Sequence, residues 1–184
     1  MTTAPAPAAR RRPAEAVPLR WGDHATRLWA GTWLIVGGGV AIAGSNTVTL
    51  WLLGVATFAH VAGWCILPSD GWRRVVAVGP STLTMWLLLT GPRFVMVLVV
   101  PYLLWLLVRH RPPVTALTAI PVAVSAVLVG EAFGLDYSRM LPALAIVGAT
   151  MAVSGWLARA WASRLLRPVT RGPSRRDGPS ATPR

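Results

Sequence analysis

Six apolar stretches separated by short polar or turn-forming segments dominate the hydrophobic pattern of this chain. A bilayer core about 30 Å thick requires roughly 20 helical residues, with about 17 as the usual minimum. We therefore predict an all-α integral membrane protein with six transmembrane helices in three hairpins. The predicted spans cover residues 28–44, 48–67, 75–90, 94–108, 114–130 and 140–161.

The third and fourth apolar stretches are the shortest, and their spanning depends on the residues beside them. Arg73, Arg74 and Arg109 flank these stretches, and long arginine side chains can reach the membrane surface from a helix end that lies below it. Gly and Pro between the stretches, at Gly44, Gly91-Pro92 and Pro112-Pro113, indicate compact turns. The six spans form one transmembrane domain, residues 19–163.

The two ends of the chain lack any apolar repeat. Residues 1–18 are rich in Ala, Pro and Arg, and residues 164–184 in Arg, Pro, Ser and Gly, so we expect both to be disordered tails. A cleaved signal is the alternative for the first span, because Ala41-Ile42-Ala43 resembles a cleavage site and Arg11-Arg12 a twin-arginine signal. The long basic segment before it favours an uncleaved span.

Composition and charge sharpen this picture. The chain is 54% hydrophobic and only 13% charged, which is improbable for a soluble domain. All 18 basic residues are arginine, and 16 of these 18 lie at the two ends of the chain or in the segments after the second and fourth spans. We therefore expect a bacterial-type plasma membrane protein, and the positive-inside rule predicts that both of its termini are on the cytoplasmic side. With a single cysteine, Cys65, the chain can form no intramolecular disulfide.

The predicted partners follow from the same pattern. The lipid bilayer surrounds the spans, and we expect anionic lipid headgroups at the C-terminal arginines, since each such residue attracts an anionic surface by about 1 kcal/mol. Without a folded recognition module, those arginines do not indicate nucleic acid. They are Arg164, Arg167, Arg171, Arg175 and Arg176.

Small residues predict how the helices pack. Two stripes recur at helical spacing in the fifth and sixth spans, and we expect them to face each other across a tight contact. The stripes are Ala116, Ala119, Ala123, Ala126 and Gly130, and Ala145, Gly148, Ala152 and Gly155. Residues 94–108 contain no Gly, Ala, Ser or Thr, so we expect that helix at the bundle edge. There Met96, Leu98, Leu103 and Trp105 would contact lipid or a partner membrane protein.

One candidate ligand site lies inside the spans. His60 is the titratable residue most deeply placed, and intramembrane ionisable groups are functional hypotheses by default. Ala56, His60 and Gly63 share one helical face, so the imidazole should point into the bundle. Three successive glycines, Gly37-Gly38-Gly39, would line a site beside it or simply allow tight packing. A neutral histidine bonded to a neighbouring carbonyl or hydroxyl is the structural alternative.

A second candidate is the outer mouth, formed by Arg93, Glu131 and Asp136. Paired carboxylates can serve as acid and base, yet nothing in the sequence places a nucleophile beside them, and local pairing of Asp136 with Arg139 is the simpler interpretation. Asp23 and Asp70, near the opposite surface, should cap helices or pair with nearby arginines. No motif indicates a metal site or a cofactor.

These features favour a non-catalytic scaffold or accessory subunit of a membrane complex, with residues 94–108 as a docking face. The alternative is a small-molecule transporter or substrate-binding subunit whose site includes His60 and the three glycines. A membrane enzyme acting through Glu131, Asp136 or the Asp23-His24 pair is the third hypothesis.

Overall fold

The computed structural model describes residues 22–165, and this part of the chain is entirely helical, without a β-strand. The predicted tail at 1–18 and residues 166–184 of the predicted tail at 164–184 lie outside the described residues, whereas Arg164 and Leu165 belong to the last helix, contrary to the prediction. Six α-helices form the fold, several of them extended by a 3-10 segment. They are α1 (His24–Ala43), α2 (Leu50–Ile66), α3 (Gly71–Leu87), α4 (Val99–Val108), α5 (Ala119–Phe133) and α6 (Met140–Leu165).

The 3-10 segments lengthen the short helices. The segments η2 (Thr47–Thr49), η4 (Pro92–Leu98), η5 (Pro113–Thr118) and η6 (Tyr137–Arg139) each lead directly into the α-helix that follows, while η3 (Leu88–Thr90) extends α3. Each predicted span therefore corresponds to one helical segment. The third begins at Gly71, one turn before the apolar stretch that predicted it, so that Arg73 and Arg74 lie in its first turn.

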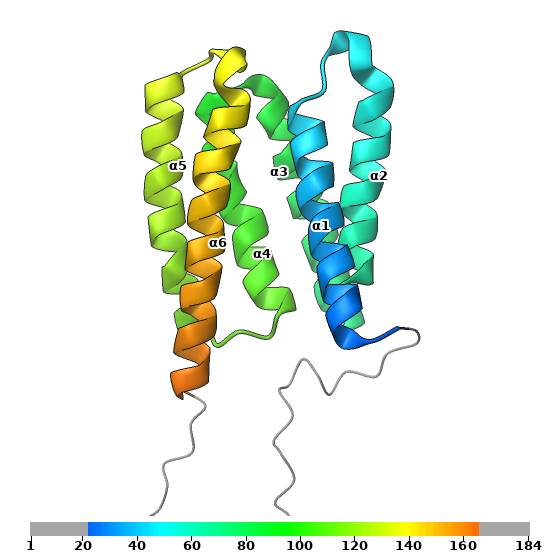
Figure 1. Cartoon of the computed structure of the whole chain (residues 1–184), viewed down its shortest axis with the longest axis vertical. Helices are drawn as coiled ribbons and strands as arrows, with labels where there is room; N and C mark the ends of the chain where they lie inside the picture. The colour runs from blue at the N-terminus through cyan, green and yellow to red at the C-terminus, as the bar shows by residue number, and fades with distance from the viewer. Residues whose placement is uncertain (1–21, 166–184) are drawn as a thin grey trace, which may run out of the picture.

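The helices run up and down side by side, and each of the pairs α1–α2, α3–α4 and α5–α6 is in contact (Figure 1). As a result, the start of α1 and the finish of α6 lie at the same end of the bundle. Most described arginines belong to the helix ends or connections there, and we call it the arginine-rich end; they are Arg27, Arg73, Arg74, Arg109, Arg111, Arg159 and Arg164. Arg93 and Arg139 belong to the opposite end.

Glycines bring α1 and α2 together over most of their length. A methyl group on Gly63 would lie 2.7 Å from the carbonyl oxygen of Gly31, and one on Gly38 would lie 2.6 Å from the amide nitrogen of His60. Real side chains do not approach backbone so closely, so these positions admit only hydrogen. Close backbone approach at small residues is the usual basis of helix association in lipid.

The predicted contact between the small-residue stripes of the last two helices is wrong for α6. The stripe on α5 is buried at Ala119, Ala126 and Gly130, but Ala145, Gly148 and Ala152 of α6 are exposed. Instead α6 buries a neighbouring face, which includes Ala143, Val147, Ser154 and Ala158. The reason is that α6 contacts η4 and η5 as well as α5, and this combination of neighbours selects the face.

The fourth helical segment is not at the bundle edge, contrary to the prediction. It contacts α3, α5 and α6 and buries Leu98, Tyr102 and Leu106 along one face. Its neighbours supply the small residues that it lacks: a methyl group on Gly155 of α6 would lie 3.7 Å from the Trp105 ring. Met96 and Leu103 are exposed, so a partner protein at residues 94–108 stays a prediction.

Length and composition alone allow two helical segments to cross a membrane. These are Pro113–Phe133, with 21 residues, and Tyr137–Arg164, with 28 residues. Leu50–Ile66 and Pro92–Val108 are apolar but shorter.

Candidate functional site

His60 lies at the centre of a polar network that joins the first three helices. Its side chain is fully buried, as the helical face that it shares with Ala56 and Gly63 predicts. The ring nitrogen Nδ1 lies 2.9 Å from the carbonyl oxygen of Ile35 in α1, and Nε2 lies 2.9 Å from the hydroxyl of Ser81 in α3. Trp64 donates its indole N–H to Nε2 over 3.1 Å and to the Ser81 hydroxyl over 3.0 Å.

These partners determine the form of the imidazole. A carbonyl oxygen can only accept, so Nδ1 carries the proton and donates to Ile35, while Nε2 accepts from Trp64 and Ser81. This arrangement suits a neutral ring with both nitrogens bonded to protein. The structural alternative considered from the sequence, a neutral histidine bonded to a carbonyl and a hydroxyl, describes this geometry.

Two of the three predicted glycines lie beside this network. Gly38 and Gly39 are buried, and a methyl group on Gly39 would lie 3.0 Å from the sulfur of Met85 and 3.9 Å from Nδ1 of His60. Gly37 is exposed, and a methyl group on it would meet nothing within 4 Å, so the structure does not bring it to His60. Protein atoms occupy the space next to Gly38 and Gly39, and ligand binding there stays a prediction.

The predicted outer mouth separates into two parts at the end opposite the arginine-rich end. Asp136 accepts hydrogen bonds from the Ser138 hydroxyl and amide, which lower the pKa of its carboxyl, and its other oxygen lies 3.1 Å from Nε of Arg139. This is the local pairing that the sequence predicted. Arg93 and Glu131 are exposed and lie on different helices, with the backbone of Arg93 packed against Gly130.

Arginines at the arginine-rich end bind the carbonyl groups where two helices finish. Arg27, only 6% exposed, donates from Nε to Ile66 O over 3.0 Å, and Arg74 donates to Cys65 O over 2.8 Å. Arg73 donates to Leu107 O over 2.8 Å. The last carbonyls of a helix have no intrahelical partner and carry the negative end of its dipole, so these bonds cap α2 and α4.

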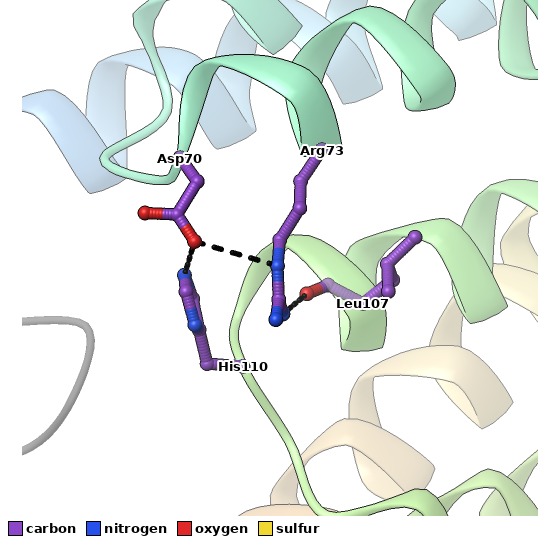
Figure 2. Close-up of polar contacts among 4 residues, drawn as sticks. All are labelled: Asp70, Arg73, Leu107 and His110. Atoms are coloured by element: carbon purple, nitrogen blue, oxygen red, sulfur yellow. Dashed lines mark hydrogen bonds and ion pairs between the residues drawn. The ribbon is translucent and has the colours of Figure 1, made fainter.

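A second polar cluster joins the start of α3 to the end of α4, as Figure 2 shows. Asp70 lies 3.6 Å from Nε of Arg73, which confirms one predicted arginine pairing, and 3.5 Å from Nε2 of His110. Asp70 occupies the N-cap position of α3, but its side chain makes no capping bond; Asp23 does cap α1, accepting from the Thr26 amide over 3.0 Å. The contact with His110 was missed because it depends on how two distant turns pack.

The backbone of His110 ends α4 in an unusual way. Its φ of 52° is left-handed, a region that glycine normally occupies at this position after a helix. The amide of His110 donates to Leu107 O and that of Arg111 to Leu106 O, which together form a Schellman motif. Burial lowers the pKa of His110, helped by the positive charges of Arg73 and Arg109 and opposed by Asp70.

Within residues 22–165, no three His, Cys, Asp or Glu side chains gather in an arrangement that could hold a metal ion. Comparisons of the chain with protein-family models, with curated proteins and with solved structures find no match. The functional argument therefore depends on the geometry of this chain.

Proposed function

We propose that this chain is a six-span integral protein of a bacterial-type plasma membrane, folded as three hairpins with both ends in the cytoplasm. Within that membrane it serves as a non-catalytic scaffold or accessory subunit of a larger complex.

The exterior of the bundle supports a membrane location. Large apolar side chains such as Phe58 and Val75, each 76% exposed, lie on its outer surface, and soluble monomers rarely expose extensive apolar patches. Several exposed tryptophans lie toward the two ends of the bundle, as in the aromatic belts of membrane proteins. Trp29, Trp72 and Trp161 lie toward the arginine-rich end, and Trp51 and Trp86 toward the other.

The short helices are compatible with six spans once their 3-10 extensions are included. The segment η4–α4 runs without a break from Pro92 to Val108, and α3–η3 from Gly71 to Thr90. At about 1.5 Å per α-helical residue and about 2 Å per 3-10 residue, both approach the thickness of a bilayer core. The arginine-rich end faces the cytoplasm in this arrangement, in accord with the positive-inside rule.

One observation carries the non-catalytic part of the proposal. Both ring nitrogens of His60, the most deeply placed titratable group of the predicted spans, are bonded to protein. A carrier or an enzyme using this imidazole needs a nitrogen directed at a ligand. At the outer surface, Asp136 is likewise engaged by Ser138 and Arg139.

The C-terminal arginines add a lipid contact to the proposal. Arg159 and Arg164 are exposed at the end of α6, while Arg167, Arg171, Arg175 and Arg176 lie outside the described residues. We propose that this segment binds anionic headgroups of the cytoplasmic leaflet, at about 1 kcal/mol per residue near the surface.

Affinity purification of the full chain in a mild detergent tests the scaffold role. A stoichiometric membrane partner should co-purify, and a folded His60→Leu variant should retain it in full. An absence of any partner, together with a solute that binds the wild type and not the variant, would instead support the carrier hypothesis. Reporter fusions at each terminus test the topology, and a reporter active outside the cytoplasm at either end would contradict it.

A further inference from the structure

An apolar groove of about 390 Å³ runs between the fourth and fifth helical segments. Phe94, Val97 and Val100 line it on one side, and Ala123 and Val127 of α5 on the other. A second depression, of about 280 Å³, continues along the same face of α5 and shares Ala123 and Val127. Together they form an elongated apolar surface that begins near the end opposite the arginine-rich end.

Two groups of opposite charge lie where this groove begins. Arg93 directly precedes Phe94 in the groove wall, and its carbonyl oxygen lies 3.0 Å from the position that a methyl group on Gly130 would take. Glu131 follows Gly130, so the close backbone approach brings the two charged residues to adjacent helix ends. Both are exposed, and neither takes part in an ion pair recorded within residues 22–165.

The other two charged residues at this end, in contrast, do form an ion pair. Asp136 and Arg139 pair with each other at 3.1 Å, and the Arg139 guanidinium also lies 5.6 Å from the centre of the Phe133 ring. Arg93 does not contribute to the proposed orientation, since the positive-inside rule concerns cytoplasmic arginines, and its exposed charge beside an apolar groove is available to a ligand.

We propose that this groove binds one phospholipid of the outer leaflet whose zwitterionic headgroup carries a primary amine. This inference rests on the membrane location proposed above. One acyl chain lies along the apolar groove, the phosphate binds Arg93, and the ammonium binds Glu131.

The chemistry of the two charged groups selects this headgroup. The arginine fork matches the oxygens of a phosphate, and a primary ammonium presents three N–H donors to a carboxylate. A choline headgroup has no N–H donor for Glu131. An anionic phospholipid such as phosphatidylglycerol has no positive group for Glu131 and is repelled by its carboxylate.

Native mass spectrometry of the full chain in mild detergent tests the proposal with phosphatidylethanolamine, phosphatidylcholine and phosphatidylglycerol of identical acyl chains. The wild type should retain phosphatidylethanolamine most strongly. Arg93→Gln should reduce this retention about tenfold, in line with the loss of a charge-assisted hydrogen bond. Glu131→Gln should abolish the preference for phosphatidylethanolamine over phosphatidylcholine, and Val97→Trp, which fills the groove, should weaken retention of all three lipids.

Arg139→Gln is the matched control, because it removes the paired arginine at the same surface, and it should leave retention unchanged. Equal retention of the three lipids, a preference for phosphatidylglycerol, or equal effects of Arg93→Gln and Arg139→Gln would overturn the lipid site while leaving the membrane location intact. Recovery of the chain in solution without detergent would overturn the membrane location itself.

Discussion

The imidazole of His110 faces the carboxylate of Asp70 at 3.5 Å and thereby joins the turn before α3 to the turn after α4. His110 holds this position in a left-handed conformation, with Arg73 bonded to Leu107 O beside it. Burial and the positive charges of Arg73 and Arg109 disfavour the charged form of the ring, whereas Asp70 favours it. The disfavouring effects are larger, so the pKa of His110 is lowered. The junction is therefore arranged around a neutral histidine.

The pH dependence of stability should report this histidine. Because the pKa of His110 is lowered by folding, the unfolded chain binds more protons below its ordinary value of about 6.5, so stability is lost as the pH falls through that value. His110→Asn keeps a residue that tolerates the left-handed conformation and cannot titrate. Thermal unfolding in detergent should be measured between about pH 7.5 and about pH 5, an interval that brackets the ordinary pKa of histidine. This variant should lose less stability over that interval than the wild type.

Asp70→Asn provides the opposite test. It removes the attraction that favours the charged ring, so the loss of stability on acidification should become steeper than in the wild type. The remaining histidines, His24 and His60, are common to all these chains and cancel in the comparison. Identical pH profiles for the wild type and His110→Asn would show that this junction does not respond to protons.

Gly38→Ala should destabilise the protein, whereas Gly37→Ala should not. A methyl group at Gly38 would meet the backbone of His60 at 2.6 Å, while one at Gly37 meets nothing within 4 Å. Overpacking of this kind costs about 1–3 kcal/mol, and an exposed helical glycine replaced by alanine stabilises by about 0.5–1 kcal/mol. Thermal unfolding of the two variants in the same detergent measures the difference, and equal melting temperatures would contradict the tight α1–α2 contact.

The burial of α6 predicts different outcomes at two alanines that are two residues apart and therefore point to different sides of the helix. Ala143 is fully buried, so Ala143→Leu should cost about 1–3 kcal/mol through overpacking. Ala145 belongs to the exposed stripe, and Ala145→Leu should change stability by no more than about 0.5 kcal/mol. A larger loss at Ala145 would indicate that the two small-residue stripes face each other after all.

His60→Leu should lower stability without removing a working group. The substitution leaves Ile35 O without its imidazole donor and Trp64 with Ser81 as its remaining partner. Hydrogen bonds between helices in membranes contribute about 0.6–2 kcal/mol, so the melting temperature should fall measurably. Phe58→Leu, at an exposed position of the same helix, is the control and should leave it unchanged.

The sequence predicted the elements of this fold far better than their contacts. Apolar runs located every described helix within a few residues, because apolar runs of this length that are bounded by Gly and Pro favour helices over strands. The helical face shared by Ala56, His60 and Gly63 correctly predicted that the imidazole points into the bundle. The same criterion of small residues was wrong for α6, whose small-residue stripe is exposed. A stripe of small residues packs only where the neighbouring surface is complementary to it.

Contacts between distant turns were beyond prediction for the same reason. Nothing near His110 in the sequence indicates Asp70 as its neighbour, since the pairing depends on how the α3–α4 hairpin closes. The position of α4 inside the bundle depends on Gly130 and Gly155, which belong to other helices. Residues 94–108 contain neither glycine, so their sequence alone does not indicate the buried position of this helix.

The arginines that cap α2 and α4 couple two properties that protein engineers usually adjust separately. Arg27, Arg73 and Arg74 supply part of the charge asymmetry expected to orient the chain, and each also bonds to a carbonyl at a helix terminus. Substituting them to reverse the proposed orientation of the chain would also remove hydrogen bonds from those termini. A variant that fails to invert would then be hard to tell from one that inverts and is degraded, so a topology redesign of this chain should relocate Arg159 or Arg164 first.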